Sequence, residues 1–135
     1  MLQRTIAEKV SCTGVGLHSG AAAQLTLHPA RANTGIVFVR SDFGEPVEIP
    51  ARSSEVVSTS LATKLGRGDA TVGTVEHLLG ALYGLCIDNI RIEIDGPELP
   101  DLLAGVIERC LRKDPEERYQ SAREILAELR SGSSL

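Results

Sequence analysis

Short segments of residues 1–100 alternate between hydrophobic and polar positions, which is the pattern of strands with one buried face. The clearest segment is 90–94, where three isoleucines share one face and Asp95-Gly96-Pro97 ends the strand. Four other segments have the same character, at 24–28, 36–39, 47–49 and 55–58. Strands with one buried face predict a mainly antiparallel sheet.

A helical period interrupts these strands between Thr74 and Gly84. Its apolar residues recur at i, i+3, i+4 and i+7, and they are Val75, Leu78, Leu79 and Leu82. Thr74 is the expected N-cap of this helix and Gly84 its expected C-cap. A sheet with one apolar face and a helix to cover it predicts an α+β fold, a two-layer sandwich with helices on one face.

Residues 101–135 have a helical period and a higher density of charge. An apolar stripe is formed by Leu103, Val106, Ile107, Cys110 and Leu111. Asp114-Pro115 is typical of a capped helix start, and the segment from Ser121 to Glu124 matches a capping box. We therefore divide the chain into an α/β domain over 1–100 and a helical segment over 101–135, which we expect to pack on the first domain.

The composition, with 42% hydrophobic and 24% charged residues, is that of a globular protein. The net charge of −4 gives no electrostatic reason to expect a nucleic-acid partner. No apolar run reaches the roughly 20 residues of a transmembrane helix, and the N-terminus lacks a signal-peptide core. Cys12, Cys86 and Cys110 are far apart and odd in number, which indicates neither a disulfide framework nor a metal knuckle but a reducing cytoplasm.

Two places in the chain offer candidate chemistry. Glu76-His77 lies in the first turn of the predicted helix, where an imidazole could bind a metal and the adjacent carboxylate could take a proton from water. An isolated Glu-His pair is more often a solvated helix start, and a zinc site needs three protein ligands as a rule. His18 lies between Gly14 and Gly20, where glycines let the backbone approach a ligand; a plain turn between strands explains the same pattern.

Longer motifs carry a resemblance to a known family. They are Gln3-Arg4-Thr5-Ile6, Val10-Ser11-Cys12-Thr13-Gly14-Val15-Gly16-Leu17-His18-Ser19-Gly20, Pro29-Ala30-Arg31-Ala32-Asn33-Thr34-Gly35-Ile36-Val37-Phe38, Thr74-Val75-Glu76-His77-Leu78-Leu79-Gly80-Ala81-Leu82, Gly84-Leu85-Cys86-Ile87-Asp88-Asn89 and Asp95-Gly96-Pro97-Glu98-Leu99-Pro100. In this order they resemble the N-terminal domain of UDP-3-O-acyl-N-acetylglucosamine deacetylases, the zinc hydrolases of lipid A biosynthesis. The resemblance covers residues 2–100.

The resemblance implies a fold like the second domain of ribosomal protein S5, and a role for each candidate residue. His77 corresponds to a zinc ligand and Glu76 to the general base. Leu17 and His18 correspond to the loop at the mouth of the active site, which would bind the UDP-acyl-GlcNAc substrate. In the family a second domain supplies the other zinc ligands and a catalytic histidine. Residues 101–135 contain no histidine, so an incomplete zinc site and no activity of this chain alone are expected.

Residues 102–126 resemble the last helices of a bacterial serine/threonine kinase domain, with a core running from Leu111 to Ala122. The other kinase motifs are absent from the sequence, so kinase activity is not expected. The two resemblances meet near residues 99–102, as in a truncated or recombined reading frame or a chimera. The apolar stripe of the tail is then expected to replace a second helix that covers the sheet in the family.

Two classes of function follow from these patterns. The first is a truncated or chimeric deacetylase that keeps one zinc ligand and the general base. The second is a non-enzymatic α/β interaction module, or a recombined reading frame without selected function. The exposed half-site and the uncovered sheet edge favour association, with a second copy of the chain or with a chain that carries the complementary domain.

Overall fold

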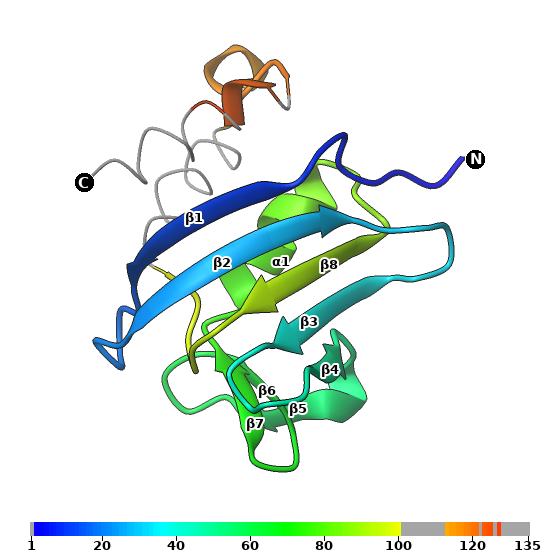
Figure 1. The fold of residues 1–135 in the computed structure, drawn as a ribbon. Coiled ribbons are helices and arrows are strands. Elements are labelled where there is room, and N and C mark those ends of the chain that lie inside the picture. Colours follow the sequence, from blue (N-terminus) through cyan, green and yellow to red (C-terminus); the bar gives the residue numbers. More distant parts are fainter. Residues whose placement is uncertain (1, 101–112, 122, 126, 128–135) are drawn as a thin grey trace.

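The computed structural model describes residues 2–100, 113–121, 123–125 and 127 (Figure 1). Its strands are β1 (Val10–Val15), β2 (Ala22–Pro29), β3 (Ile36–Arg40), β4 (Val47–Pro50), β5 (Val56–Ser58), β6 (Lys64–Arg67), β7 (Ala70–Gly73) and β8 (Ile90–Ile94). Its helical elements include the α-helix α1 (Glu76–Gly84) and the 3-10 turns η1 (Ser53–Glu55) and η2 (Pro115–Glu117), and residues 123–125 and 127 are also α-helical. Every strand predicted from the sequence is present.

Five strands form the main sheet, in the order β1-β2-β8-β3-β4. Only the β3–β8 pair is parallel, and the other three pairs are antiparallel, so the predicted α+β fold with a mainly antiparallel sheet is confirmed. β8, the last strand among the described residues, lies between β2 and β3 and has neighbours on both sides. This central position explains why its isoleucines are buried completely.

The register places the apolar residues of neighbouring strands in rows on one face. Leu25 lies opposite both Cys12 and Ile94, and Ile92 lies opposite Phe38. All of these side chains belong to one hydrophobic cluster. A shift of one residue in any strand would turn its apolar side chains to the opposite face, so burial of this face fixes the register.

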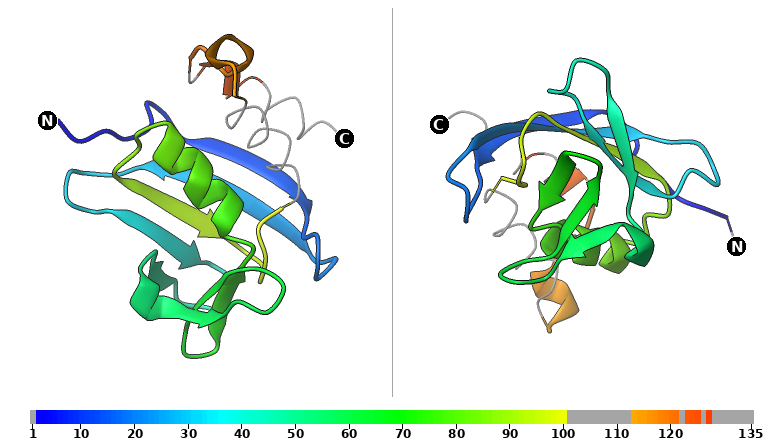
Figure 2. Two further views of the ribbon diagram at one scale, coloured as in Figure 1. Left: turned by 180° about the vertical axis from the view of Figure 1, so that it is seen from behind. Right: turned by 90° about the horizontal axis from the view of Figure 1, so that it is seen from below.

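Helix α1 covers the apolar face of the main sheet, and the view from behind shows it lying across the strands (Figure 2). It buries Leu78, Ala81 and Leu82. The predicted caps were wrong: Thr74 makes no cap bond, the N-cap position is Val75, and the C-cap position is Leu85. The left-handed residue after the helix is Cys86, with φ of 58°, and not Gly84.

A second sheet, in the order β5-β6-β7, was only partly foreseen, because β6 and β7 were missed. It lies on the same side of the main sheet as α1 (Figure 2). Leu65 of β6 and Val72 of β7 are buried in the same hydrophobic cluster as the main sheet. Their sequences, KLGR and ATVG, each contain a glycine, and their buried positions do not alternate with exposed ones, so no strand pattern is visible.

The buried side chain of Arg40 links the two sheets. The register turns it toward the apolar face, where it is 5% exposed. Its guanidinium donates to the Thr71 carbonyl on β7 and makes two bonds to the Asp42 carboxylate, of 2.8 and 2.6 Å. The Arg40 side chain holds the pKa of Asp42 below its ordinary value, chiefly through this hydrogen bonding. A buried charge needs such partners, so the contact fixes the small sheet against β3.

The apolar stripe of the tail lies outside the described residues, so its packing on the sheet stays a prediction. Asp114 and Pro115 do begin a helical turn, with the Asp114 carboxylate accepting from Glu116 N at 3.0 Å, but this turn is a 3-10 helix. Tyr119 is 8% exposed and belongs to the hydrophobic cluster of the sheet. The division of the chain at residue 100 also stays a prediction. Among the described helices, none has the length and apolar character needed to cross a membrane.

Candidate functional site

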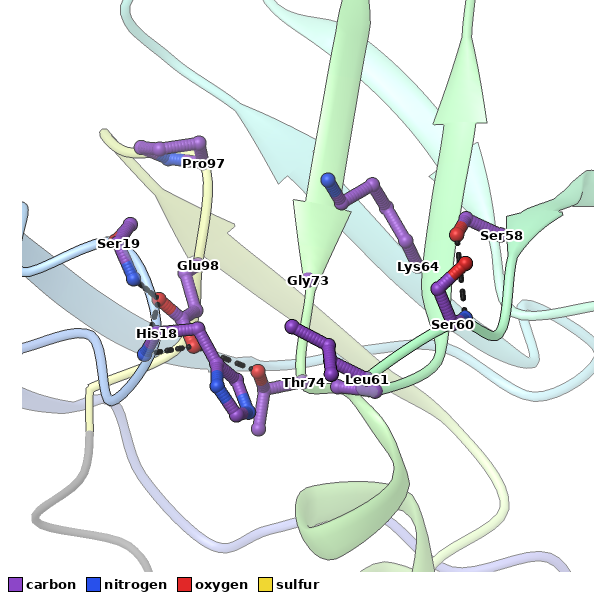
Figure 3. Close-up of a pocket in the computed structure, with 11 residues that line it drawn as sticks. His18, Ser19, Ser58, Ser60, Leu61, Lys64, Gly73, Thr74, Pro97 and Glu98 are labelled. Atoms are coloured by element: carbon purple, nitrogen blue, oxygen red, sulfur yellow. Dashed lines mark hydrogen bonds between the residues drawn. The ribbon is translucent and has the colours of Figure 1, made fainter.

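A cavity of about 300 Å³ lies where three distant segments meet at one end of the main sheet. These segments are the loop between β1 and β2, the segment between β5 and α1, and the chain that follows β8. Figure 3 shows the lining, which is formed by His18, Ser19, Ser58, Ser60, Leu61, Ala62, Lys64, Gly73, Thr74, Pro97 and Glu98. Seven of these eleven residues have polar side chains, although more of the exposed lining surface is apolar than polar, so the cavity offers both kinds of contact.

Glu98 occupies the centre of this junction. It is 4% exposed, and its carboxylate accepts hydrogen bonds from two segments that are far away in the sequence. His18 N donates to both oxygens, at 3.0 and 3.2 Å, and Ser19 N donates to Oε2 at 2.7 Å. The Thr74 hydroxyl donates to Oε1 at 2.8 Å. One carboxylate therefore binds the β1–β2 loop and the β7–α1 junction together.

The hydrogen bonds around Glu98 decide its charge. Burial by itself would raise the pKa of this carboxyl. The backbone N–H groups of Ser19 and His18 and the hydroxyls of Ser19 and Thr74 outweigh burial and lower the pKa from 4.5 to about 2. Each of these donors favours the ionised form. Glu98 is therefore a buried carboxylate at neutral pH.

Gly16 and Thr74, which lie beside the Glu98 carboxylate, occupy positions that few residue types tolerate. At Gly16, an added Cβ would overlap Glu98 Oε2 and would lie 2.7 Å from Ser19 Oγ, so the loop approaches the carboxylate only because this residue is glycine. Thr74 has a φ of 58°, which is rare for a β-branched residue. The Thr74–Glu98 bond is one of the contacts that hold this conformation.

Of the two candidate sites predicted from the sequence, only the one at His18 contributes to the cavity lining. His18 lines the cavity, and Leu17 before it is 60% exposed. Glu76 and His77 follow the cavity residue Thr74 at the start of α1. Glu76 is half-buried, and its Oε2 accepts from Thr63 N at 3.1 Å, while His77 is exposed. The Thr63 bond fixes the orientation of the Glu76 carboxylate.

The described residues do not form a complete metal centre. They contain no group of three or more His, Cys, Asp and Glu side chains that could hold a metal ion. At the predicted position they offer one exposed imidazole, His77, beside a carboxylate that is bonded to the backbone. Because zinc normally takes three protein ligands, this part of the chain does not fit a complete zinc site.

Two residues that line the cavity, Glu98 and Lys64, were not predicted as functional residues from the sequence. Glu98 stood within Asp95-Gly96-Pro97-Glu98-Leu99-Pro100, which marked the end of a strand and supported the family resemblance but gave the glutamate no role. Lys64 belongs to the small sheet that was partly missed. No short-range pattern points to either residue, because their neighbours in the cavity come from elsewhere in the chain.

The mixed sheet, its covering helix and the cavity define a class of molecule, an α+β domain with a cavity of polar and apolar lining at one end of its sheet. Comparison with known proteins gives the family. The family model "LpxC: UDP-3-O-acyl N-acetylglycosamine deacetylase" matches residues 3–105. The chain therefore belongs to the UDP-3-O-acyl N-acetylglycosamine deacetylase family.

Individual relatives agree with this assignment. The UDP-3-O-acyl-N-acetylglucosamine deacetylase of Anaeromyxobacter dehalogenans is 63% identical over 100 residues, which are 74% of this chain and 32% of that protein. The same enzyme of Myxococcus xanthus is 60% identical over 98 residues, 73% of this chain and 31% of that protein. The bifunctional enzyme LpxC/FabZ of Chlorobaculum tepidum is 51% identical over 100 residues, 74% of this chain and 21% of that protein. The chain thus spans about a third of the length of the first two relatives.

Proposed function

We propose that this chain supplies the first part of the catalytic machinery of a zinc-dependent deacetylase of lipid A biosynthesis, with UDP-3-O-acyl-N-acetylglucosamine as substrate. The observation that carries this proposal is the family match over residues 3–105, which includes the cavity and the start of α1. Hydrolysis of the acetamide group needs a proton acceptor for water, and a group that stabilises the charge on the carbonyl oxygen.

In this proposal Glu76 is the general base. Its Oε2 is held by the Thr63 N–H at 3.1 Å, and we assign proton transfer to Oε1. His77 is a zinc ligand, and its exposed position in the first turn of α1 leaves the imidazole accessible. The described residues do not complete the ligand set. We therefore propose that turnover requires the part that the longer relatives carry beyond the matched third, and that these 135 residues alone are inactive.

The cavity is the proposed binding site for the polar part of the substrate. The ammonium group of Lys64 and the hydroxyls of Ser58 and Ser60 are donors of the kind that bind phosphate and sugar oxygens. Leu61, at 83% exposed, adds apolar surface to the cavity lining, and Leu17, at 60% exposed, precedes the cavity residue His18. An acyl chain would contact such surface, because its burial is favourable at about 25 cal/mol per Å².

The proposed function is tested by assaying acetate release from UDP-3-O-acyl-N-acetylglucosamine with zinc present. Two samples are compared, this chain alone and this chain mixed with a separate chain. The separate chain carries the residues of the Anaeromyxobacter dehalogenans relative that lie beyond the matched part. We expect no release by the chain alone and release by the mixture. Acetate release by the chain alone would contradict the proposal that its set of zinc ligands is incomplete. A mixture that elutes as one complex and releases no acetate would overturn the proposed function.

A non-enzymatic interaction module is the second candidate. It is favoured by large apolar side chains that are exposed, notably Leu61 at 83%, Tyr83 at 86% and Val57 at 56%. Under this alternative the chain would bind a partner through these residues without turnover. The same mixture separates the two candidates, because a module would form a complex that gains no zinc-dependent acetate release. The kinase resemblance of the tail, the junction near residues 99–102 and a cytoplasmic location stay predictions.

A further inference from the structure

The buried carboxylate of Glu98 connects two segments that are far apart in the sequence. Its partners come from two segments that carry the proposed site. His18 N and Ser19 N belong to the β1–β2 loop, and the Thr74 hydroxyl belongs to the turn that leads into α1. In Figure 3 the dashed bonds from both segments converge on this one side chain. Because one carboxylate bonds to both segments, its loss would remove these bonds from both of them at once, while the backbone contacts around Glu98 remain.

The chain around Glu98 is itself fixed by backbone bonds. Gly73 N donates to Pro97 O at 2.8 Å, and Leu99 N donates to Gly73 O at 3.1 Å. Pro100 forms a bridge with Gly16 on the other side. The carboxylate therefore extends from a backbone that is anchored to both neighbours. It can hold the loop in place because its own position does not depend on the loop alone.

Further hydrogen bonds connect this junction to the start of α1. Thr74 is two residues before Glu76, and the residue between them, Val75, donates to Thr63 O at 3.3 Å. Thr63 N in turn donates to Glu76 Oε2 at 3.1 Å. The left-handed φ of Thr74, 58°, turns the chain from β7 into the helix at this point. A change at Glu98 thus reaches His18 directly and the Glu76-His77 turn through Thr74.

We propose that Glu98 is a positioning residue, which locks the His18 loop onto the β7–α1 junction and so sets the geometry of the cavity. The inference rests on the proposed function only in taking this cavity as the substrate site. Glu98 touches no reacting group in this account. It acts through His18, Ser19 and Thr74, and Gly16 provides the space for its carboxylate.

The test is amide hydrogen exchange, measured residue by residue by NMR, in Glu98→Gln. The amide side chain keeps the shape of the carboxylate but has one acceptor oxygen and no charge. We expect exchange at His18 N and Ser19 N to rise at least tenfold. Exchange at core amides, such as those of Ile92 and Leu79, is expected to rise only by the factor that the measured loss of global stability accounts for, and the rise at His18 and Ser19 should exceed that factor. Glu93→Gln is the matched control, because Glu93 is on β8 with a 44% exposed side chain, and it should leave His18 and Ser19 unchanged.

A second variant keeps the test decisive if Glu98→Gln does not fold. Thr74→Val has the same β-branched shape and loses only the hydroxyl that donates to Glu98 at 2.8 Å. We expect a smaller but local rise of exchange at His18 and Ser19, and Thr74→Ser, which keeps the hydroxyl, should restore slow exchange.

Two results would overturn the positioning role. One is unchanged exchange at His18 and Ser19 in whichever of the two variants folds. The other is a uniform rise over all amides, which would mean that the residue serves general stability only. Because exchange is read without substrate, its failure leaves the deacetylase proposal standing. A failed acetate assay in turn leaves the exchange result standing.

Discussion

The apolar face of the main sheet and the polar junction around Glu98 are built in different ways. The sheet face consists of rows of alternating apolar side chains, and its central strand β8 contributes Ile90, Ile92 and Ile94 with no exposed surface. The junction has few regular elements and is joined by the hydrogen bonds of one buried carboxylate. The sheet provides stability through the area it buries. The junction provides geometry, because its directional bonds fix which residues meet.

This difference predicts how each region responds to substitution. A lost methylene in the sheet face weakens the whole fold, because the cluster extends across all five strands. A lost hydrogen bond in the junction leaves the sheet intact and changes the cavity.

Ile92→Ala should have the largest effect. Ile92 is fully buried in the central strand, with Leu27 and Phe38 opposite it on the two neighbouring strands. Truncation of such a residue leaves a cavity and costs about 2–5 kcal/mol. Urea unfolding of the purified variant measures this loss. A loss below about 1 kcal/mol would mean that the sheet face is not the main source of stability.

Glu98→Gln should cost about 1.5–3 kcal/mol at neutral pH, the usual range for hydrogen bonds to a charged group. The folded pKa of Glu98 is about 2, below its ordinary 4.5, so the ionised carboxylate stabilises the fold above pH 4.5. This contribution is lost as the pH falls from 4.5 toward 2. The difference in unfolding free energy between the wild type and the variant should therefore be constant above about pH 5 and shrink below it. A difference that stays constant down to the acid limit of folding would contradict the account.

Gly16→Ala and Gly80→Ala form a matched pair with opposite signs. A Cβ at Gly16 would overlap the Glu98 carboxylate and crowd Ser19, so we expect a loss of about 1–3 kcal/mol. A Cβ at Gly80 meets nothing within 4 Å on helix α1, so we expect a gain of up to about 1 kcal/mol. Thermal unfolding of both variants checks the pair. Equal changes in the two would show that the close approach at Gly16 is unimportant.

Glu48→Gln should have the smallest effect. Glu48 and Arg91 form an ion pair at 2.7 Å, with 54% and 39% of their side chains exposed. Exposed pairs of this kind contribute about 0.2–1 kcal/mol and are screened by salt. Urea unfolding at low and high salt measures the contribution. A loss as large as that of Glu98→Gln would show that surface charge matters as much as the buried junction.

The same contrast explains which features the sequence could predict. The isoleucines of β8 and the period of α1 are short-range patterns, so α1 and five of the eight described strands followed from patterns of this kind, whereas β1, β6 and β7 did not. Thr74 was expected to cap the helix, but its hydroxyl donates to Glu98 instead. The role of Glu98 could not be foreseen, because its donors His18 and Ser19 are near the other end of the matched region. The roles of Glu76 and His77 rest on family resemblance and stay proposals.

The most direct test of the account is acetate release by the two-chain mixture with one histidine replaced at a time. His77 is at the start of α1, next to the junction, whereas His28 is on the opposite face of the sheet and bonded to Glu93 at 2.9 Å. We predict that His77→Ala abolishes zinc-dependent release and that His28→Ala keeps it close to the wild-type rate. Undiminished release by His77→Ala would contradict the account, and so would an equal loss in both variants.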